Sequence, residues 1–263
     1  MPTNFDKDTP PTDIDWDEFH PTSPYDVYVP QSPPRKRWSI VLGIVLYLAG
    51  QLSVSFWLPR LLIGAGVISA REAHEAAQSL INVLTFWLMD VANVVSVALI
   101  LAAVLGFYRE KLASLGFTSK KVPKALLYGV LGFVVAFVVT TAVGYPIQQR
   151  FGTDPTQEAL SQATEAPGLF PLVIVSGVII APISEEIVFR GYLYKAFRDH
   201  FKPSHAIVLS AVIFSVLHLE LLATVQLFIV GILLAYVYEK TGNLMAPITL
   251  HVLNNAVAFL VFH

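Results

Sequence analysis

Long apolar runs alternate with short polar segments along most of the chain, from residue 38 almost to its end. A membrane-spanning helix needs about 20 mostly apolar residues. Segments that meet or approach this requirement are 38–59, 80–107, 123–147, 169–197, 204–219, 222–239 and 246–262. The pattern therefore predicts an all-α fold, a polytopic membrane helix bundle of about seven transmembrane helices. The count becomes eight if residues 60–77 contain a re-entrant segment.

The composition supports a membrane protein and excludes some classes of partner and of functional site. The chain is 55% hydrophobic and 14% charged, with a mean hydropathy of +0.62, whereas a soluble domain carries about 25% charged residues. A net charge of −2 gives no reason to expect a nucleic-acid partner. The absence of cysteine excludes disulfides, thiolate metal sites and a cysteine nucleophile.

The N-terminal segment differs from the rest of the chain. It is rich in proline and acidic residues, with Lys7 as the single base before the cluster at 35–37. Such a segment cannot bury enough apolar surface to offset its loss of entropy on ordering. We therefore divide the chain into a disordered acidic tail (1–37), N-terminal transmembrane helices (38–122) and a C-terminal core (123–263).

The basic residues indicate how the helices are oriented. They gather at 35–37, 109–124, 195–202 and 240, in segments that fall on one side of the membrane if seven helices span it. Cytoplasmic loops carry an excess of Lys and Arg. The distribution therefore predicts a cytoplasmic N-terminus. The segment 60–79, whose Ala/Glu-rich end favours a helix, would then lie along the outer interface.

A first group of ionisable residues lies within the fourth predicted helix, in the sequence APISEEIVFRGY at 181–192. Glu186 and Arg190 are four residues apart, with the acid first, which is the favourable order for an ion pair on a helix. Glu185 is turned by about 100° from Glu186 and is left on another face. Ionisable groups inside a membrane indicate function by default, although a purely structural ion pair explains these residues equally well.

Two further groups lie on later helices. His218 ends the sequence FSVLH, and His251 and Asn255 lie four residues apart, on one face of the last predicted helix. Each has a simple structural explanation, because His and Asn often form hydrogen bonds between membrane helices. Taken together, the three groups supply a base, an imidazole that can hold a water molecule and donors for an oxyanion. This set suits hydrolysis of a peptide bond.

The same residues are compatible with a metal. Glu185, His218 and His251 could be three ligands of a zinc ion. The HExxH sequence of familiar zinc peptidases is absent. The sequence therefore leaves a metal-free site and a zinc site as alternatives, and we expect no cofactor.

The order EExxxR, FxxxH, HxxxN on late apolar segments resembles the CPBP family, the CAAX-processing type II prenyl endopeptidases and their bacterial relatives, the Abi or bacteriocin-processing proteins. The resemblance covers roughly residues 120–263. It implies that Glu185 is the general base and that His218 helps to activate water. It further implies that His251 and Asn255 are oxyanion donors, and that Glu186 and Arg190 form a supporting ion pair. The family was long described as metalloproteases, and a glutamate-activated water without metal is now the favoured picture for it.

The leading hypothesis is thus an intramembrane endopeptidase of a bacterial plasma membrane, in contact with lipid and acting on a membrane-associated or lipid-modified protein or peptide. One alternative is a non-catalytic immunity or adaptor protein, in which the same residues are structural. Another is a proton-coupled transporter that uses Glu185, His218 and His251 as a relay. Asp90 and Asn93 in the second predicted helix and Gln226 in the sixth give this alternative some support. The sequence sets neither the substrate nor the oligomeric state.

Overall fold

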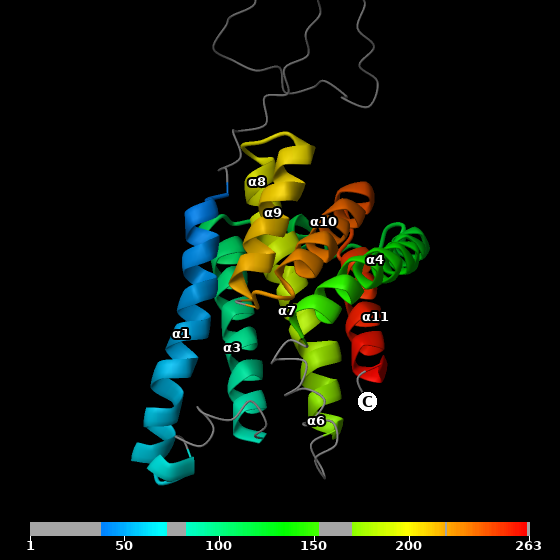
Figure 1. Ribbon diagram of the computed structural model, residues 1–263. Coiled ribbons are helices and arrows are strands. Elements are labelled where there is room, and N and C mark those ends of the chain that lie inside the picture. The colour runs from blue at the N-terminus through cyan, green and yellow to red at the C-terminus, as the bar shows by residue number, and fades with distance from the viewer. Residues whose placement is uncertain (1–37, 73–82, 153–169, 219, 262–263) are drawn as a thin grey trace, which may run out of the picture. The chain divides into compact units, whose positions relative to one another are not determined.

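The computed structural model describes residues 38–72, 83–152, 170–218 and 220–261. Every regular element within these residues is a helix (Figure 1). The predicted all-α membrane bundle is therefore confirmed. The acidic tail predicted over residues 1–37 lies outside the described residues.

The described residues form α-helices, one 3₁₀ turn and three π-helical segments. In chain order they are α1 (Ile40–Gly64), α3 (Val83–Ala102), η1 (Ala103–Phe107), η2 (Leu112–Leu115), α4 (Val122–Phe151), α6 (Phe170–Ile174), η3 (Val175–Ile180), α7 (Ala181–Glu186), η4 (Ile187–Tyr194), α8 (Lys195–Arg198), α9 (Pro203–Leu217), α10 (Thr224–Thr241) and α11 (Met245–Val261). Of these, η2 is a 3₁₀ turn, and η1, η3 and η4 have π-helical geometry.

Each predicted apolar segment corresponds to a helical stretch, but the stretches differ in length. Among the described residues, five are long and apolar enough to cross a membrane: 40–64, 86–107, 122–151, 170–198 and 224–241. Two are shorter, Pro203–Leu217 and Met245–Phe259. At 1.5 Å per residue, α9 is only about 22 Å long, less than the roughly 30 Å of a bilayer core. The residues that follow α9 therefore lie within the thickness of the helix bundle and not at its far end.

The region 60–79 divides between two elements. Residues up to Gly64 continue α1. A new helix begins at Ala70, where the Ser69 Oγ accepts from the Glu72 amide and the Glu72 carboxylate accepts from the Ser69 amide (2.7 Å). This reciprocal cap lowers the pKa of Glu72, chiefly through the backbone N–H of Ser69. The described part of the segment is thus helical where the sequence predicts it, and residues 73–82 lie outside the described residues.

Two groups of helices form the packed body. In the first, α1 packs along α3. In the second, α4 packs on α10 and α11, and α9 packs on α10. Gly129 allows α4 and α11 to approach closely, because a Cβ at this position would lie 2.6 Å from the carbonyl oxygen of Ala246. The fourth helical stretch, from α6 to α8, contacts both groups and is the most buried of the five long ones (Figure 1).

The loops that the basic residues place on one side meet at one end of the bundle. The Trp38 amide donates to the Asp199 carboxylate (3.0 Å), and Lys195 Nζ donates to the Ser114 carbonyl. Asn243 donates to the carbonyl of Thr118 (3.1 Å). The start of α1 and the segments around 114–120, 195–199 and 243 therefore share one end of the bundle, as the predicted sidedness requires.

The fourth helical stretch is irregular around Pro182. The Ala181 N–H donates to the Ser176 carbonyl, five residues back, which is π-helical spacing. The next bond in this ladder would join residue 182 to the Gly177 carbonyl, but proline has no N–H. The sequence thus leaves the Gly177 carbonyl without its partner inside the helix. Wide turns of this kind often occur at functional sites.

Candidate active site

A buried ion pair lies at the centre of the site. Arg190 Nη1 donates to Glu186 Oε1 at 2.8 Å, and both side chains are fully buried. Arg190 Nη2 also reaches the Gly231 carbonyl on α10 at 3.3 Å. A glycine fits there because α9 and α10 nearly touch, so that an added Cβ would lie 3.0 Å from the Ala211 Cα. The arginine thus neutralises Glu186, as the spacing predicts, and also ties the fourth helix to α10.

Glu186 has a second partner that the sequence analysis did not identify. Its Oε1 lies 2.8 Å from Nδ1 of His251, a buried residue on α11. A carboxylate oxygen only accepts hydrogen bonds, so Nδ1 of His251 donates. A neutral imidazole carries one hydrogen, and its Nε2 then presents a lone pair. Glu186 therefore fixes both the orientation and the tautomer of His251.

His218 is fixed in a similar way by the end of α9. Its Nδ1 lies 2.7 Å from the Phe214 carbonyl, one of the last carbonyls of the helix, which lack partners within it. Because the carbonyl accepts, Nδ1 donates and the neutral ring leaves its lone pair on Nε2. His218 is thus a helix cap as well as a candidate site residue.

The ring of Phe214 supports both imidazoles. It is fully buried, and its centroid lies 4.5 Å from that of His218 and 5.8 Å from that of His251. The Arg190 guanidinium lies 4.4 Å from the centre of the same ring. The sequence motif FxxxH contained this residue, but nothing in the sequence showed that its ring would touch three site side chains.

Glu185 lies opposite the two imidazoles. Its Oε2 is 3.7 Å from Nε2 of His218 and 3.8 Å from Nε2 of His251. Among the described residues, this buried oxygen has no hydrogen-bond partner. Three acceptors therefore face one another at distances too long for direct hydrogen bonds. A molecule that donates hydrogen bonds, such as water, suits the space between them.

Asn255 lies one turn beyond His251 on α11. Its Nδ2 donates to the Gly177 carbonyl at 2.9 Å, the carbonyl that Pro182 leaves without a partner. This bond occupies one of the two amide hydrogens of Asn255, and the second hydrogen stays available to another acceptor. Within the described part of the chain, no hydrogen bond joins Asn255 to Glu185. The predicted oxyanion role of Asn255 stays a prediction.

Glu185, His218 and His251, the side chains of the alternative zinc site, lie around one space. The described residues contain no group of three His, Cys, Asp or Glu side chains arranged to hold a metal ion. The donor types would be acceptable to zinc, since both Nε2 atoms present lone pairs and each Nδ1 is held by an oxygen. The metal-free site and the zinc site therefore stay alternatives, and we derive no step through a metal.

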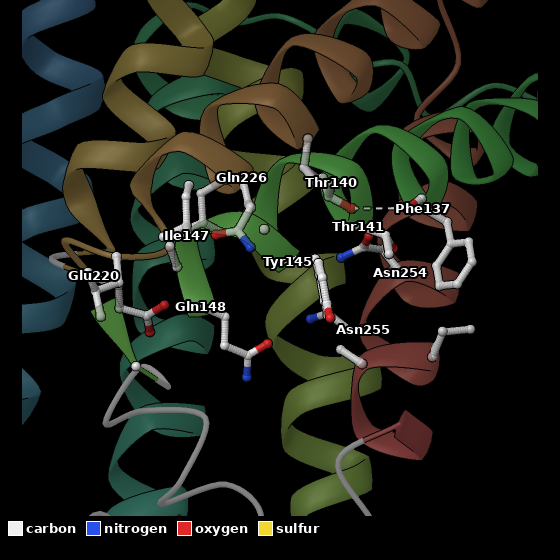
Figure 2. A pocket seen from close by; sticks show the side chains of 18 residues that line it. Phe137, Thr140, Thr141, Tyr145, Ile147, Gln148, Glu220, Gln226, Asn254 and Asn255 are labelled. Carbon is white, nitrogen blue, oxygen red and sulfur yellow. Dashed lines mark hydrogen bonds between the residues drawn. The ribbon is translucent and has the colours of Figure 1, made fainter. Parts of the chain in front are cut away.

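A pocket of about 400 Å³ adjoins this cluster (Figure 2). Residues from α4, from the start of α10 and from α11 line it. Asn255 belongs to its wall, and so does Glu220, two residues after His218. The glutamate and the two histidines of the cluster do not line it. The pocket is thus a neighbouring space that shares one residue with the candidate site.

Comparison with known proteins gives two kinds of match. Residues 167–257 match the family model described as type II CAAX prenyl endopeptidase Rce1-like, and this segment contains all the candidate site residues. The chain is similar to the putative membrane peptidase YdiL of Bacillus subtilis (strain 168), with 27% identity over 224 residues, 84% of this chain and 86% of the relative. It is also similar to the membrane-embedded CAAX protease MroQ of Staphylococcus aureus (strain USA300), with 21% identity over 228 residues, 84% of this chain and 87% of the relative. No solved structure matches the chain.

These matches and the geometry agree on the class of protein. An apolar helix bundle that buries a Glu–His cluster, matched over that cluster by a peptidase family, is an integral membrane protein of the membrane-peptidase class. Within that class, residues 167–257 resemble the Rce1-like type II CAAX prenyl endopeptidases, in agreement with the resemblance stated from the motifs.

Proposed function

We propose that the protein is an intramembrane endopeptidase that hydrolyses a peptide bond with a water molecule held by Glu185, His218 and His251. The observation that carries the proposal is the convergence of the Glu185 carboxylate on both Nε2 atoms, at 3.7 and 3.8 Å. Water donates two hydrogen bonds, and here it meets a carboxylate and two imidazole lone pairs. Its oxygen is thereby held with its own lone pairs available for attack.

In the first step, Glu185 takes a proton from this water as the oxygen forms a bond to the carbonyl carbon of the substrate. The carbonyl oxygen becomes the oxyanion of a tetrahedral intermediate. In the second step, the C–N bond breaks and the proton passes from Glu185 to the leaving nitrogen. The products are a carboxylic acid, which then ionises, and an amine. Base catalysis of this type accounts for roughly 10²–10⁴ in rate.

The tautomer of His251 restricts when it can serve as an oxyanion donor. With Nδ1 donating to Glu186, a neutral His251 has no hydrogen on Nε2 to offer. It gains one only when it takes a proton during the reaction, from the water or from Glu185. The uncommitted amide hydrogen of Asn255 is available from the start. We therefore assign Asn255 the donor role throughout and His251 that role only in its charged form.

The substrate in this proposal is a membrane-associated or lipid-modified protein or peptide, and no nucleic acid is involved. The relatives are a membrane peptidase and a CAAX protease by name, which supports a substrate at the membrane. The basic loops favour a cytoplasmic N-terminus. The bacterial relatives favour a bacterial plasma membrane.

Cleavage by the purified protein in lipid nanodiscs tests this function. The expected result is cleavage by the wild type and loss of cleavage in Glu185→Ala, His218→Ala and His251→Ala, each of which must insert and fold normally. Retained cleavage in all three variants would contradict the proposal. An immunity or adaptor protein would instead bind its partner without cutting it, whether or not Glu185 is replaced by Gln.

Metal analysis of the same active preparation tests the metal-free mechanism. We expect full activity without stoichiometric zinc and after treatment with a chelator. Zinc that leaves together with activity would instead support the alternative in which Glu185, His218 and His251 are ligands.

A further inference from the structure

The pocket beside the cluster contains polar side chains that the protein does not pair. Thr141 and Tyr145 come from α4, Gln226 from α10 and Asn254 from α11, and Figure 2 shows them around one space. Within the described residues, none of these four side chains forms a hydrogen bond. Gln226 and Asn254 are half-buried, and Thr141 and Tyr145 are exposed at the rim. A polar molecule in the pocket would therefore meet two half-buried carboxamides and two hydroxyls that have no partner within the described residues.

The charges of the lining residues restrict which chemical class of molecule can bind in the pocket. The residues that line the pocket include no Lys, Arg or His, and Glu220 is the acidic one among them. A phosphate headgroup or a terminal carboxylate would need a cation or a set of backbone N–H groups to bind it. An anionic group therefore does not match this pocket.

The polar groups also disfavour a lipid chain. An isoprenoid or acyl chain occupying the pocket would remove water from Gln226, Asn254, Thr141 and Tyr145 without offering hydrogen bonds. Each group that loses water without gaining a new partner is then destabilised. The remaining class is an uncharged guest with both donors and acceptors, such as polypeptide with amide or hydroxyl side chains.

The position of the pocket connects it to the chemistry. Asn255 lies on the pocket wall and is one helical turn from His251, whose Nε2 faces Glu185. Glu220 and His218 likewise share the segment that joins α9 to α10. A polypeptide with its scissile bond at the cluster would extend a neighbouring residue into the pocket.

We propose that this pocket is a specificity subsite for an unlipidated residue with an uncharged polar side chain, namely Asn, Gln, Ser or Thr, close to the scissile bond. The proposal rests on the endopeptidase function above and adds the class of substrate residue that the enzyme selects. Gln226 and Asn254 are the selecting carboxamides in this subsite. An aliphatic residue or an S-prenylated cysteine at the same substrate position is disfavoured.

The first test is a cleavage profile. The full-length protein in nanodiscs is incubated with a peptide library, and the cut sites are mapped by mass spectrometry, with Glu185→Gln as the blank. The wild type should cut preferentially where Asn, Gln, Ser or Thr lies at one fixed distance from the bond. In Gln226→Leu and Asn254→Leu this preference should fall about five- to tenfold, the value of one hydrogen bond. The rate on leucine peptides, measured in each variant, is the reference against which this preference is expressed.

Thr249→Val is the matched control. It removes a hydroxyl from the same helix as Asn254, but Thr249 bonds to the Met245 carbonyl and does not line the pocket. It should leave the preference unchanged. An unchanged preference in Gln226→Leu and Asn254→Leu, or a wild-type preference for S-prenylated cysteine at that position, would overturn the subsite while the endopeptidase function stands.

A second test measures occupancy without cleavage. The chain has no cysteine, so Gln226→Cys carries a unique thiol, and Leu221→Cys places one on an 87% exposed residue outside the lining. Both are made with Glu185→Gln and labelled with a maleimide. An unlipidated peptide with a central Gln-Ser-Asn should slow labelling at position 226 severalfold and leave position 221 unaffected. Protection by an S-farnesylated peptide alone, or no protection at 226, would refute the subsite even if no library peptide is cut.

Discussion

The two helix groups of this protein both bury polar side chains, but they satisfy them in different ways. Between α1 and α3, Gln51 Nε2 donates to Asn93 Oδ1 at 3.0 Å, and Ser96 Oγ donates to the Ala92 carbonyl. Asp90 accepts from Ser176 at 2.8 Å. Where the fourth helical stretch packs against the second group, the fully buried pair Glu186 and Arg190 adjoins a carboxylate oxygen of Glu185 that has no partner among the described residues.

This difference distinguishes polar residues that stabilise helix packing from polar residues that are available to bind water or substrate. Paired amides and hydroxyls between membrane helices need no further explanation, because they stabilise packing. Acceptors that converge without a donor are costly to bury. A buried polar group inside a membrane therefore points to function when its partners are missing, and more weakly when they are present.

Exchange of each membrane carboxylate for its amide tests this distinction most strongly. Glu185→Gln removes the base and should lower the cleavage rate by about 10²–10⁴. Asp90→Asn keeps an oxygen that can accept from Ser176 and should leave the rate near the wild-type value. Single-turnover assays in nanodiscs measure both. Equal losses would contradict the comparison and favour a proton relay that runs through both helix groups.

Loss of one partner of the buried ion pair should mainly affect stability. Arg190→Met leaves the Glu186 charge without compensation and should reduce the free energy of unfolding by about 3–5 kcal/mol. The double variant Glu186→Leu/Arg190→Met should recover most of that loss but remain slow, because Nδ1 of His251 loses its acceptor. Unfolding in detergent and cleavage rates provide the two readouts. A double variant with normal activity would show that the pair has no part in positioning His251.

Replacement of Phe214 should have an intermediate effect. Phe214→Leu keeps the carbonyl that binds His218 but removes the ring from both imidazoles, at about 0.5–1.5 kcal/mol for each aromatic contact. The cleavage rate should fall roughly tenfold, which corresponds to about 1.4 kcal/mol. Phe133→Leu, which alters an aromatic pair on α4 (6.1 Å between centroids), is the control. Similar rate losses in both variants would assign the effect to general destabilisation.

The smallest effect is expected for the hydrogen bond between α1 and α3. Gln51→Leu should reduce the free energy of unfolding by about 0.6 kcal/mol, the average for such bonds in membranes, with cleavage unchanged. A double-mutant cycle with Asn93→Leu isolates the pairwise energy. A marked loss of cleavage in either variant would give this group a role beyond packing.

The positions of the helices could be predicted from the sequence because apolar runs report directly on membrane-embedded segments. The lengths of the helices and their departures from regular α-helical geometry were harder to predict from the sequence. The break after α9 at Leu217 leaves His218 within the bundle, although the apolar pattern continues past it and predicted a helix to residue 219. The π-helical turns before Pro182 depend on hydrogen-bond register, which hydropathy does not encode.

Within the site, local spacing could predict only local contacts. The pair Glu186 and Arg190 lies on one helix, so its four-residue spacing was sufficient. The contact of Glu186 with His251 joins residues 65 positions apart and depends on how α11 packs against the fourth helix. The residue types indicated the chemistry, but a single sequence carries no information on which nitrogen of His251 faces which glutamate.

The link between Pro182, the Gly177 carbonyl and Asn255 predicts a dependence that natural variation can reveal. In a relative with a non-proline residue at the position of Pro182, the helix could supply its own amide to that carbonyl. Asparagine at the position of Asn255 would then no longer be needed as the hydrogen-bond donor to that carbonyl. If it persists in such lineages, selection for catalysis retains it, whereas joint loss of the two residues would show that it serves only to repair the helix.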